Sequence, residues 1–274
     1  MKNSILDKIS YHAVYDKSIV EALEYADVNG FSGIQIAIEA PHLSFEKLSE
    51  EEIEEIRKIA IDNGLNISIH CPDEGLSLFE HSSFLWEGKY KYFEALFNFS
   101  QKIMAKIITL HIGHITTYST DTMPEVKIPV EDLIISEEKF KKNLDKILKL
   151  ARKRFVICVE NYNLDDFTLK LLQPYLDNNE IYLCWDLAKT FTKEGRKNLE
   201  LEKYFLKNID KVRQIHIHDL NSQGRSHRVI GTGIIDFKEY ASVLSDKEIY
   251  DFCIEVRPRE MAKKSFENLK VVLD

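Results

Sequence analysis

Short apolar segments recur at eight places along the 274-residue chain, and each is five or six residues long at its core. Isoleucine, valine and aromatic residues dominate them, which is typical of strands buried on both faces of a parallel sheet. In chain order the segments read KISYHAV, GIQIAIE, NISIHC, IITLHI, FVICVE, IYLCWD, RQIHIHD and DFCIEV.

Helix-like segments separate most of these runs. Residues 46–63 and 137–151 place apolar side chains three and four positions apart, which gives each segment one apolar face. Strands that alternate with helices indicate βα units, whose right-handed crossovers can close eight strands into a barrel. The predicted fold class is therefore α/β, a (β/α)8 TIM barrel, as one domain over residues 1–274. The long irregular stretch 113–136 is expected to be a surface loop or a lid.

Composition narrows the function classes. The formal net charge of −8 disfavours nucleic acid as a partner, and the basic segment 139–154 is expected to be the solvated face of a helix. No apolar run approaches the ~18 residues of a membrane span, and the N-terminus lacks the apolar block of a secretory signal. Four cysteines without a CxxC pair indicate reduced thiols in a cytoplasmic protein.

Nearly every apolar run ends in a polar side chain. In a barrel these ends share the face that carries the active site. A buried carboxylate without a partner is costly, so several acids and imidazoles at one depth indicate a bound cation; mutual hydrogen bonding is the alternative. The residues are His12, Glu39, His70, His111, Glu160, Asp186, His216 and Glu255.

Small or medium side chains lie two positions before most of these residues, and therefore on the same strand face. They suit a layer beneath a bound ion, and we interpret the cysteines among them as packing residues rather than as thiolate ligands. The layer comprises Ser68, Thr109, Cys158, Cys184, Gln214 and Cys253.

Seven pieces, in this order, carry a family resemblance: ISIHCP, TLHIGH, ICVEN, WDLAK, IHIHDL, HRVIGTG and IEVRP. Over nearly its whole length the chain resembles the xylose isomerase-like barrels. These include sugar and sugar-phosphate isomerases and epimerases and, more distantly, endonuclease IV.

The resemblance implies one divalent metal held by Glu160, Asp186, His216 and Glu255. Carboxylates with one imidazole suit Mn²⁺, Zn²⁺, Mg²⁺ or Co²⁺. The family's spacing selects His216 rather than His218, which we expect to point toward the helices as a core histidine. No organic cofactor is expected, since the GTG turn lacks the context of a dinucleotide fingerprint.

His70 and His111 match positions that bind an additional zinc in endonuclease IV, with Glu160 as the bridge; in single-metal members they lie near the substrate. The resemblance leaves both roles open. Lys189 and Arg225 replace two ligands of a third zinc in endonuclease IV. Because charged Lys and Arg cannot ligate Zn²⁺, this third site is predicted to be absent.

Four residues are expected to bind substrate: His12, Lys189, His227 and Arg257. Lys189 would bind an anionic group, or else form a salt bridge to a neighbouring acid. Arg257 lies two positions after Glu255 and would bind a substrate oxygen or pair with Glu255. At Gln35 many isomerase members carry an acid, so this chain departs from the family's pattern.

Together these residues predict a metal-dependent isomerase or epimerase of a small sugar, sugar phosphate or related polyol. The reaction would pass through an enediolate, with Glu160 and Glu255 moving the proton. Two alternatives stay open: a phosphodiesterase of the endonuclease IV kind acting on abasic DNA, and a barrel that binds a ligand without turnover. The expected partner is a small molecule rather than nucleic acid or membrane, and homo-oligomerisation is open.

Overall fold

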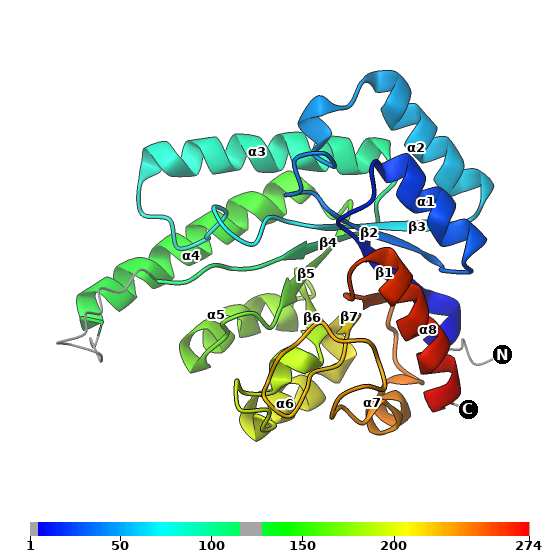
Figure 1. The fold of residues 1–274 in the computed structure, drawn as a ribbon. Coiled ribbons are helices and arrows are strands. Elements are labelled where there is room, and N and C mark those ends of the chain that lie inside the picture. The colour runs from blue at the N-terminus through cyan, green and yellow to red at the C-terminus, as the bar shows by residue number, and fades with distance from the viewer. Residues whose placement is uncertain (1–4, 116–127, 274) are drawn as a thin grey trace.

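All eight predicted runs form parallel strands in the computed structural model, which describes residues 5–115 and 128–273. Each strand pairs with the next along the chain, and β1 also pairs with β8, so the sheet closes into a barrel (Figure 1). The predicted (β/α)8 fold is thus confirmed. The strands are β1 (Ile9–Ala13), β2 (Gly33–Ala37), β3 (Asn66–His70), β4 (Ile107–Leu110), β5 (Val156–Glu160), β6 (Tyr182–Asp186), β7 (Val212–Ile217) and β8 (Asp251–Ile254).

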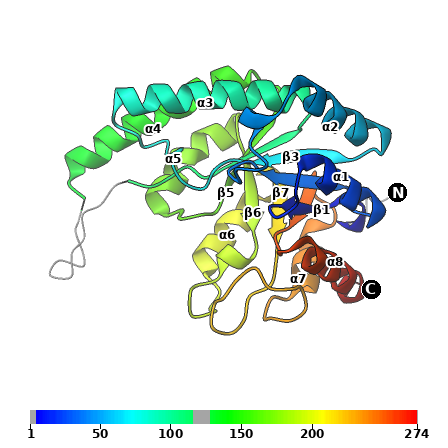
Figure 2. The ribbon, with the colours of Figure 1, turned by 45° about the horizontal axis from the view of Figure 1, so that its top comes forward.

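One helix follows each strand and lies on the outside of the barrel (Figure 2). In both views α3 and α4 lie side by side and extend beyond the barrel. None of the helices in the described part of the chain is long and apolar enough to cross a membrane. The helices are α1 (Ile19–Val28), α2 (Glu50–Asp62), α3 (Ser83–Lys102), α4 (Val130–Ala151), α5 (Asp166–Asp177), α6 (Leu199–Lys207), α7 (Phe237–Leu244) and α8 (Arg259–Leu273).

Two sequence-based boundaries are corrected. The helix expected from residue 46 begins at Glu50, because Ser49 and Glu52 form a capping box. The stretch 113–136 is not irregular throughout, since α4 already begins at Val130. Residues 116–127 of that stretch lie outside the described residues, so its expected role as a lid stays a prediction.

Side-chain alternation along each strand separates an outer apolar layer from a more polar barrel interior. On β6, Leu183 and Trp185 are fully buried in the main apolar core between sheet and helices. The intervening Cys184 belongs to a separate small inner cluster with Ile107 and Cys158. All four cysteines are buried and unpaired. The inner face of the barrel is therefore separate from the main apolar core, and it also carries buried polar side chains such as Gln35, Thr109 and Gln214.

Candidate active site and metal centre

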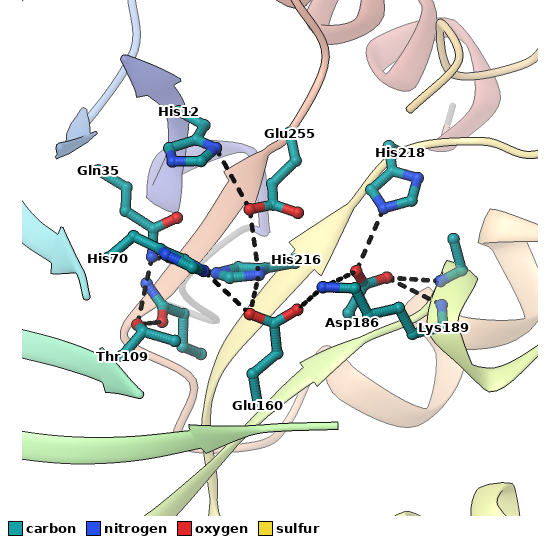
Figure 3. Close-up of polar contacts among 12 residues, drawn as sticks. His12, Gln35, His70, Thr109, Glu160, Asp186, Lys189, His216, His218 and Glu255 are labelled. Atoms are coloured by element: carbon teal, nitrogen blue, oxygen red, sulfur yellow. Dashed lines mark hydrogen bonds and ion pairs between the residues drawn. The ribbon is translucent and has the colours of Figure 1, made fainter. Parts of the chain in front are cut away.

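Four ionisable side chains converge at the carboxyl ends of the last four strands. Glu160 ends β5, Asp186 ends β6, His216 lies near the end of β7, and Glu255 directly follows β8 (Figure 3). The strand register places Asp186 beside His216. One ligand atom from each of the four lies within 4.8 Å of the others, and all four side chains are buried.

Charge in this group is balanced through His216. Its Nδ1 lies 3.4 Å from Glu160 Oε2 and 3.4 Å from Glu255 Oε1. Although burial opposes the charge, Glu255 and Glu160 raise the pKa of His216 to about 9. Burial also opposes ionisation of Glu160, but Lys189 and His216 hold its pKa well below the ordinary value. Both glutamates are therefore ionised at neutral pH, since His216 and His12 likewise lower the pKa of Glu255 against its burial.

This donor set fits a divalent cation. Three carboxylates and one imidazole are ligands of Zn²⁺ and Mn²⁺, and two ligands of one ion at about 2.1 Å lie up to about 4.2 Å apart. Since the four ligand atoms lie within 4.8 Å of one another, the site needs at most a slight contraction. In addition, His216 Nδ1 is buried and makes no hydrogen bond among the described residues. A cation between the two glutamates would give this nitrogen a partner.

Asp186 is fixed by backbone N–H groups of the turn that follows it and by the side chain of Asn161. Its Oδ1 accepts hydrogen bonds from the backbone N–H groups of Ala188 at 2.9 Å and Lys189 at 3.1 Å. The Asn161 side chain accepts from the Asp186 N–H at 2.7 Å and donates to the Asp186 carbonyl at 2.9 Å. Oδ2 thus stays directed at the site. The positioning role of Asn161 was not predicted, although it directly follows Glu160 in the ICVEN piece.

Lys189 forms the salt bridge that the sequence left as one of two alternatives. Its ammonium contacts Glu160 Oε1 and lies 3.4 Å from Asp186 Oδ2. It also lies 5.0 Å from the centre of the Tyr162 ring, at the rim of the site. The Lys189 ammonium neutralises part of the carboxylate charge from the solvent side of the site, since the Lys189 side chain is 24% exposed.

A second group of ligands lies beside the first. His70 Nε2 and His111 Nε2 lie 3.1 and 3.0 Å from Glu160 Oε2. Asp73 Oδ1 lies 3.2 Å from His111 Nδ1 and 3.7 Å from His70 Nδ1. Asp73 was not predicted; its position in HCPD, three residues after the end of β3, was the available signal. Glu39 is exposed and accepts a hydrogen bond from the Asp73 N–H at 2.9 Å, so it holds this loop rather than joining the four central residues.

His12 and Arg257 lie on the far side of Glu255. His12 Nδ1 is 3.3 Å from Glu255 Oε1 and accepts a hydrogen bond from Arg257 Nη2 at 2.9 Å. Burial lowers the pKa of His12 well below its ordinary value, so the ring is neutral and Nε2 carries the proton. This buried N–H has no partner among the described residues and is a donor for a ligand.

The prediction that His218 points toward the helices is wrong. Residues two apart on a strand share a face, so His218 follows His216 toward the site. Its Nε2 lies 3.2 Å from Asp186 Oδ2, and its Nδ1 accepts a hydrogen bond from the His227 N–H at 3.0 Å. The two rings stack with centroids 4.2 Å apart. His218 therefore helps to orient Asp186 through Oδ2, the same oxygen that Lys189 approaches.

The GTG turn is built around one buried carboxylate. Asp219 accepts hydrogen bonds from the N–H groups of Leu220, Gly231, Gly233 and Ile235 at 2.7–3.2 Å. A Cβ at Gly233 would lie 2.3 Å from Asp219 Oδ1, so only glycine permits this approach. The turn thereby carries His227 to the site, where its Nδ1 lies 2.9 Å from the Glu255 carbonyl oxygen.

A closed (β/α)8 barrel with acids and histidines at the carboxyl ends of its strands defines the class of protein. Residues 23–271 match the family described as xylose isomerase-like TIM barrel, and the chain belongs to this family. It is also 23% identical to an uncharacterised protein of Methanocaldococcus jannaschii over 222 residues, which cover 79% of this chain and 78% of the other.

Solved structures share the fold at low sequence identity. A D-tagatose 3-epimerase-like protein superimposes with a TM-score of 0.73 at 17% identity, covering 97% of both chains. Endonuclease IV from Thermus thermophilus superimposes with a TM-score of 0.67 at 18% identity, again covering 97% of both. Both branches of the resemblance are therefore present among the structural relatives, and the fold does not choose between them.

Proposed function

We propose that this protein is a metal-dependent isomerase or epimerase of a small sugar, sugar phosphate or related polyol. The observation that supports this most is the placement of Glu160 and Glu255. They come from different strands, both are ionised, and each lies 3.4 Å from the same nitrogen of His216. Two carboxylates that flank one position suit the removal of a proton and its return.

Glu160, Asp186, His216 and Glu255 would hold the metal. A bound divalent cation would supply Lewis-acid polarisation of a substrate carbonyl. One glutamate would take the proton from the carbon beside that carbonyl, which leaves an enediolate. The other would deliver a proton to the neighbouring carbon in an isomerase, or to the opposite face of the same carbon in an epimerase.

The proposed substrate is small, and four side chains around the carboxylates would bind it. His12 offers its unpartnered N–H, and His227 lies at the rim beside Glu255. Arg257 is exposed and offers a planar cation to a phosphate or carboxylate group. Lys189 would contact a substrate oxygen on release from Glu160. The buried free thiols support our further proposal that the protein works in the cytoplasm.

Proton transfer can be tested without knowing the product. The wild-type chain, loaded with Mn²⁺ or Zn²⁺, is incubated in D₂O with a panel of aldoses, ketoses and their phosphates. We expect deuterium at the carbon beside the carbonyl of the true substrate, detected by NMR. Glu160→Gln and Glu255→Gln should each lower the exchange rate by about 100- to 10,000-fold while retaining the circular dichroism spectrum. Near wild-type exchange in either variant would contradict the assignment.

The group around His70 and His111 supports a second candidate, a phosphodiesterase acting on abasic DNA, because it could hold a further ion bridged by Glu160. The ion pair of Lys189 with Glu160 and Asp186 argues against it. Zinc-dependent nicking of an abasic duplex, absent on an intact duplex, would favour this candidate over the isomerase.

A further inference from the structure

A chain of polar side chains runs through the barrel interior beneath His216. The Gln35 amide lies 3.1 Å from His216 Nε2 and 3.2 Å from Thr109 Oγ1 (Figure 3). Thr109 in turn lies 2.5 Å from the Gln214 amide, which lies 2.8 Å from Asp251 Oδ2 at the opposite end of the barrel. Such barrel interiors are usually filled by branched apolar side chains. A continuous chain of polar side chains is therefore unusual, and it indicates a function for these residues.

The two nitrogens of the His216 ring face different surroundings. Nδ1 faces Glu160 and Glu255, and Nε2 faces Gln35. A ring nitrogen that binds a cation carries no proton, so the other nitrogen of the neutral ring must carry one and needs an acceptor. If Nδ1 is the ligand atom, Nε2–H must therefore be accepted by Gln35.

Gln35 is oriented with its amide nitrogen toward His216, and its buried Oε1 has no hydrogen-bond partner in the part of the chain that the structure describes. In that orientation, an amide N–H and the ring N–H of a metal-bound His216 would oppose each other. The two ends of an amide have nearly the same size, so a half-turn exchanges them without steric cost. The half-turn gives Oε1 two donors, His216 Nε2–H and the Thr109 hydroxyl.

We propose that Gln35 is the positioning residue of His216: its carbonyl oxygen accepts Nε2–H and thereby reserves Nδ1 for the divalent cation. This inference rests on the proposed metal site. Gln35 is thus not a substrate contact on β2 but part of the support of the metal ligand.

The lower part of the chain must change with Gln35. In the structure the Thr109 hydroxyl donates to Gln214 Oε1, and Gln214 Nε2 donates to Asp251 Oδ2. For Thr109 to donate to Gln35 instead, the Gln214 amide makes the same half-turn, so that its nitrogen donates to Thr109 and its oxygen faces Asp251. Burial raises the pKa of Asp251, which favours the neutral acid that would donate to this oxygen, while the hydrogen bonds that Asp251 accepts act in the opposite direction. Each link from His216 to Asp251 would then have one donor and one acceptor, and the Gln35 amide nitrogen would occupy the place where Oε1 has no partner among the described residues.

The test compares two substitutions of Gln35 in the full-length protein. Gln35→Met keeps the length of the side chain but removes the acceptor, whereas Gln35→Glu retains an acceptor oxygen. Zn²⁺ and Mn²⁺ dissociation constants are measured by titration calorimetry. We expect Gln35→Met to weaken binding by about 10- to 100-fold and Gln35→Glu to bind at least as tightly as the wild type. Asn143→Leu is the control, because it removes a buried amide from α4 that bonds the carbonyls of Leu78 and Glu80, far from the metal ligands.

NMR of ¹⁵N-histidine-labelled wild type with Zn²⁺ reads the tautomer directly, and we expect the proton of His216 on Nε2. A proton on Nδ1 overturns the inference even if Gln35→Met fails to fold. Wild-type affinity in Gln35→Met, or equal weakening in both variants, also overturns it while the metal site stands. A wild-type chain that binds neither ion overturns the proposed function, and the inference falls with it.

Discussion

At the residue scale, Lys189 neutralises charge on two buried carboxylates, Glu160 and Asp186. It follows Asp186 by three positions, and the short 3-10 turn of residues 188–190 brings its ammonium back over Asp186 and Glu160. A metal and this ammonium compete for the same carboxylate charge. Whether Lys189 pairs with these acids depends on side-chain conformation, which sequence spacing does not determine. The sequence therefore left anion binding and salt-bridge formation by Lys189 equally open.

Lys189→Met tests whether the ammonium and a metal compete for these carboxylates. Without the ammonium the buried carboxylates repel each other, so we expect the EDTA-treated variant to lose about 3 kcal/mol of stability. Added Zn²⁺ or Mn²⁺ should then raise its melting temperature more than that of the wild type, as measured by differential scanning fluorimetry. Lys197→Met is a matched control, since Lys197 is 25% exposed and pairs with Glu202 and Glu239 outside the site. An equal metal-induced shift in the wild type and Lys189→Met would contradict the competition.

At the element scale, apolar periodicity predicted each strand because strand interiors are set by burial, whereas helix ends depend on local caps. Because Ser49 is the N-cap of α2, this helix begins at Glu50 rather than at the expected residue 46. Helix α4 begins seven residues before the expected Glu137. The GTG turn was predicted only as a tight turn. Its attachment to Asp219 could not be predicted, because the partners are twelve or more residues apart in the sequence and meet only in the folded loop.

The turn around Asp219 is open to a direct test. Asp219→Asn replaces one acceptor oxygen by a donor that faces backbone N–H groups, so we expect a loss of about 2 kcal/mol and opening of the loop. Hydrogen exchange should accelerate at the amides of Gly231, Gly233 and Ile235. Asp236→Asn is the control, because Asp236 caps α7 and asparagine is an equally good cap. Unchanged protection in Asp219→Asn would show that the turn does not depend on the carboxylate.

At the scale of the whole molecule, the barrel and the convergence of its polar strand ends followed from the sequence pattern, because eightfold closure brings every strand end to one face. The mutual arrangement of the histidines did not follow. The alternation along β7 places His218 on the same side as His216, but its pairing with Asp186 of β6 depends on the folded barrel. Asp73, in the loop after β3, joins His70 and His111 through contacts that no single strand pattern encodes. The metal-ligand assignment of Glu160, Asp186, His216 and Glu255 stays a prediction, supported by their proximity.

The buried histidines make the stability of the metal-free molecule depend on pH. Folding raises the pKa of His216 to about 9, from about 6.5 in the unfolded chain. The contribution of His216 to the free energy of unfolding is therefore complete below about pH 6.5. It is lost as the pH rises through about 9, a change of roughly 3 kcal/mol. His70 and His218 act in the same way as His216. Although burial opposes the charge of these two imidazoles, Glu160 raises the pKa of His70 and Asp186 raises the pKa of His218.

We therefore expect the free energy of unfolding of EDTA-treated protein, measured in urea, to fall between pH 6.5 and 9 by about 3 kcal/mol or more. Burial lowers the pKa values of His12 and His227, so their titration lies below this window. With saturating Zn²⁺, His216 would be held neutral as a ligand, and the decline with pH should shrink or reverse because the metal no longer competes with a proton. A flat profile in EDTA, or the same decline with Zn²⁺ present, would contradict the coupling of His216 to Glu160 and Glu255.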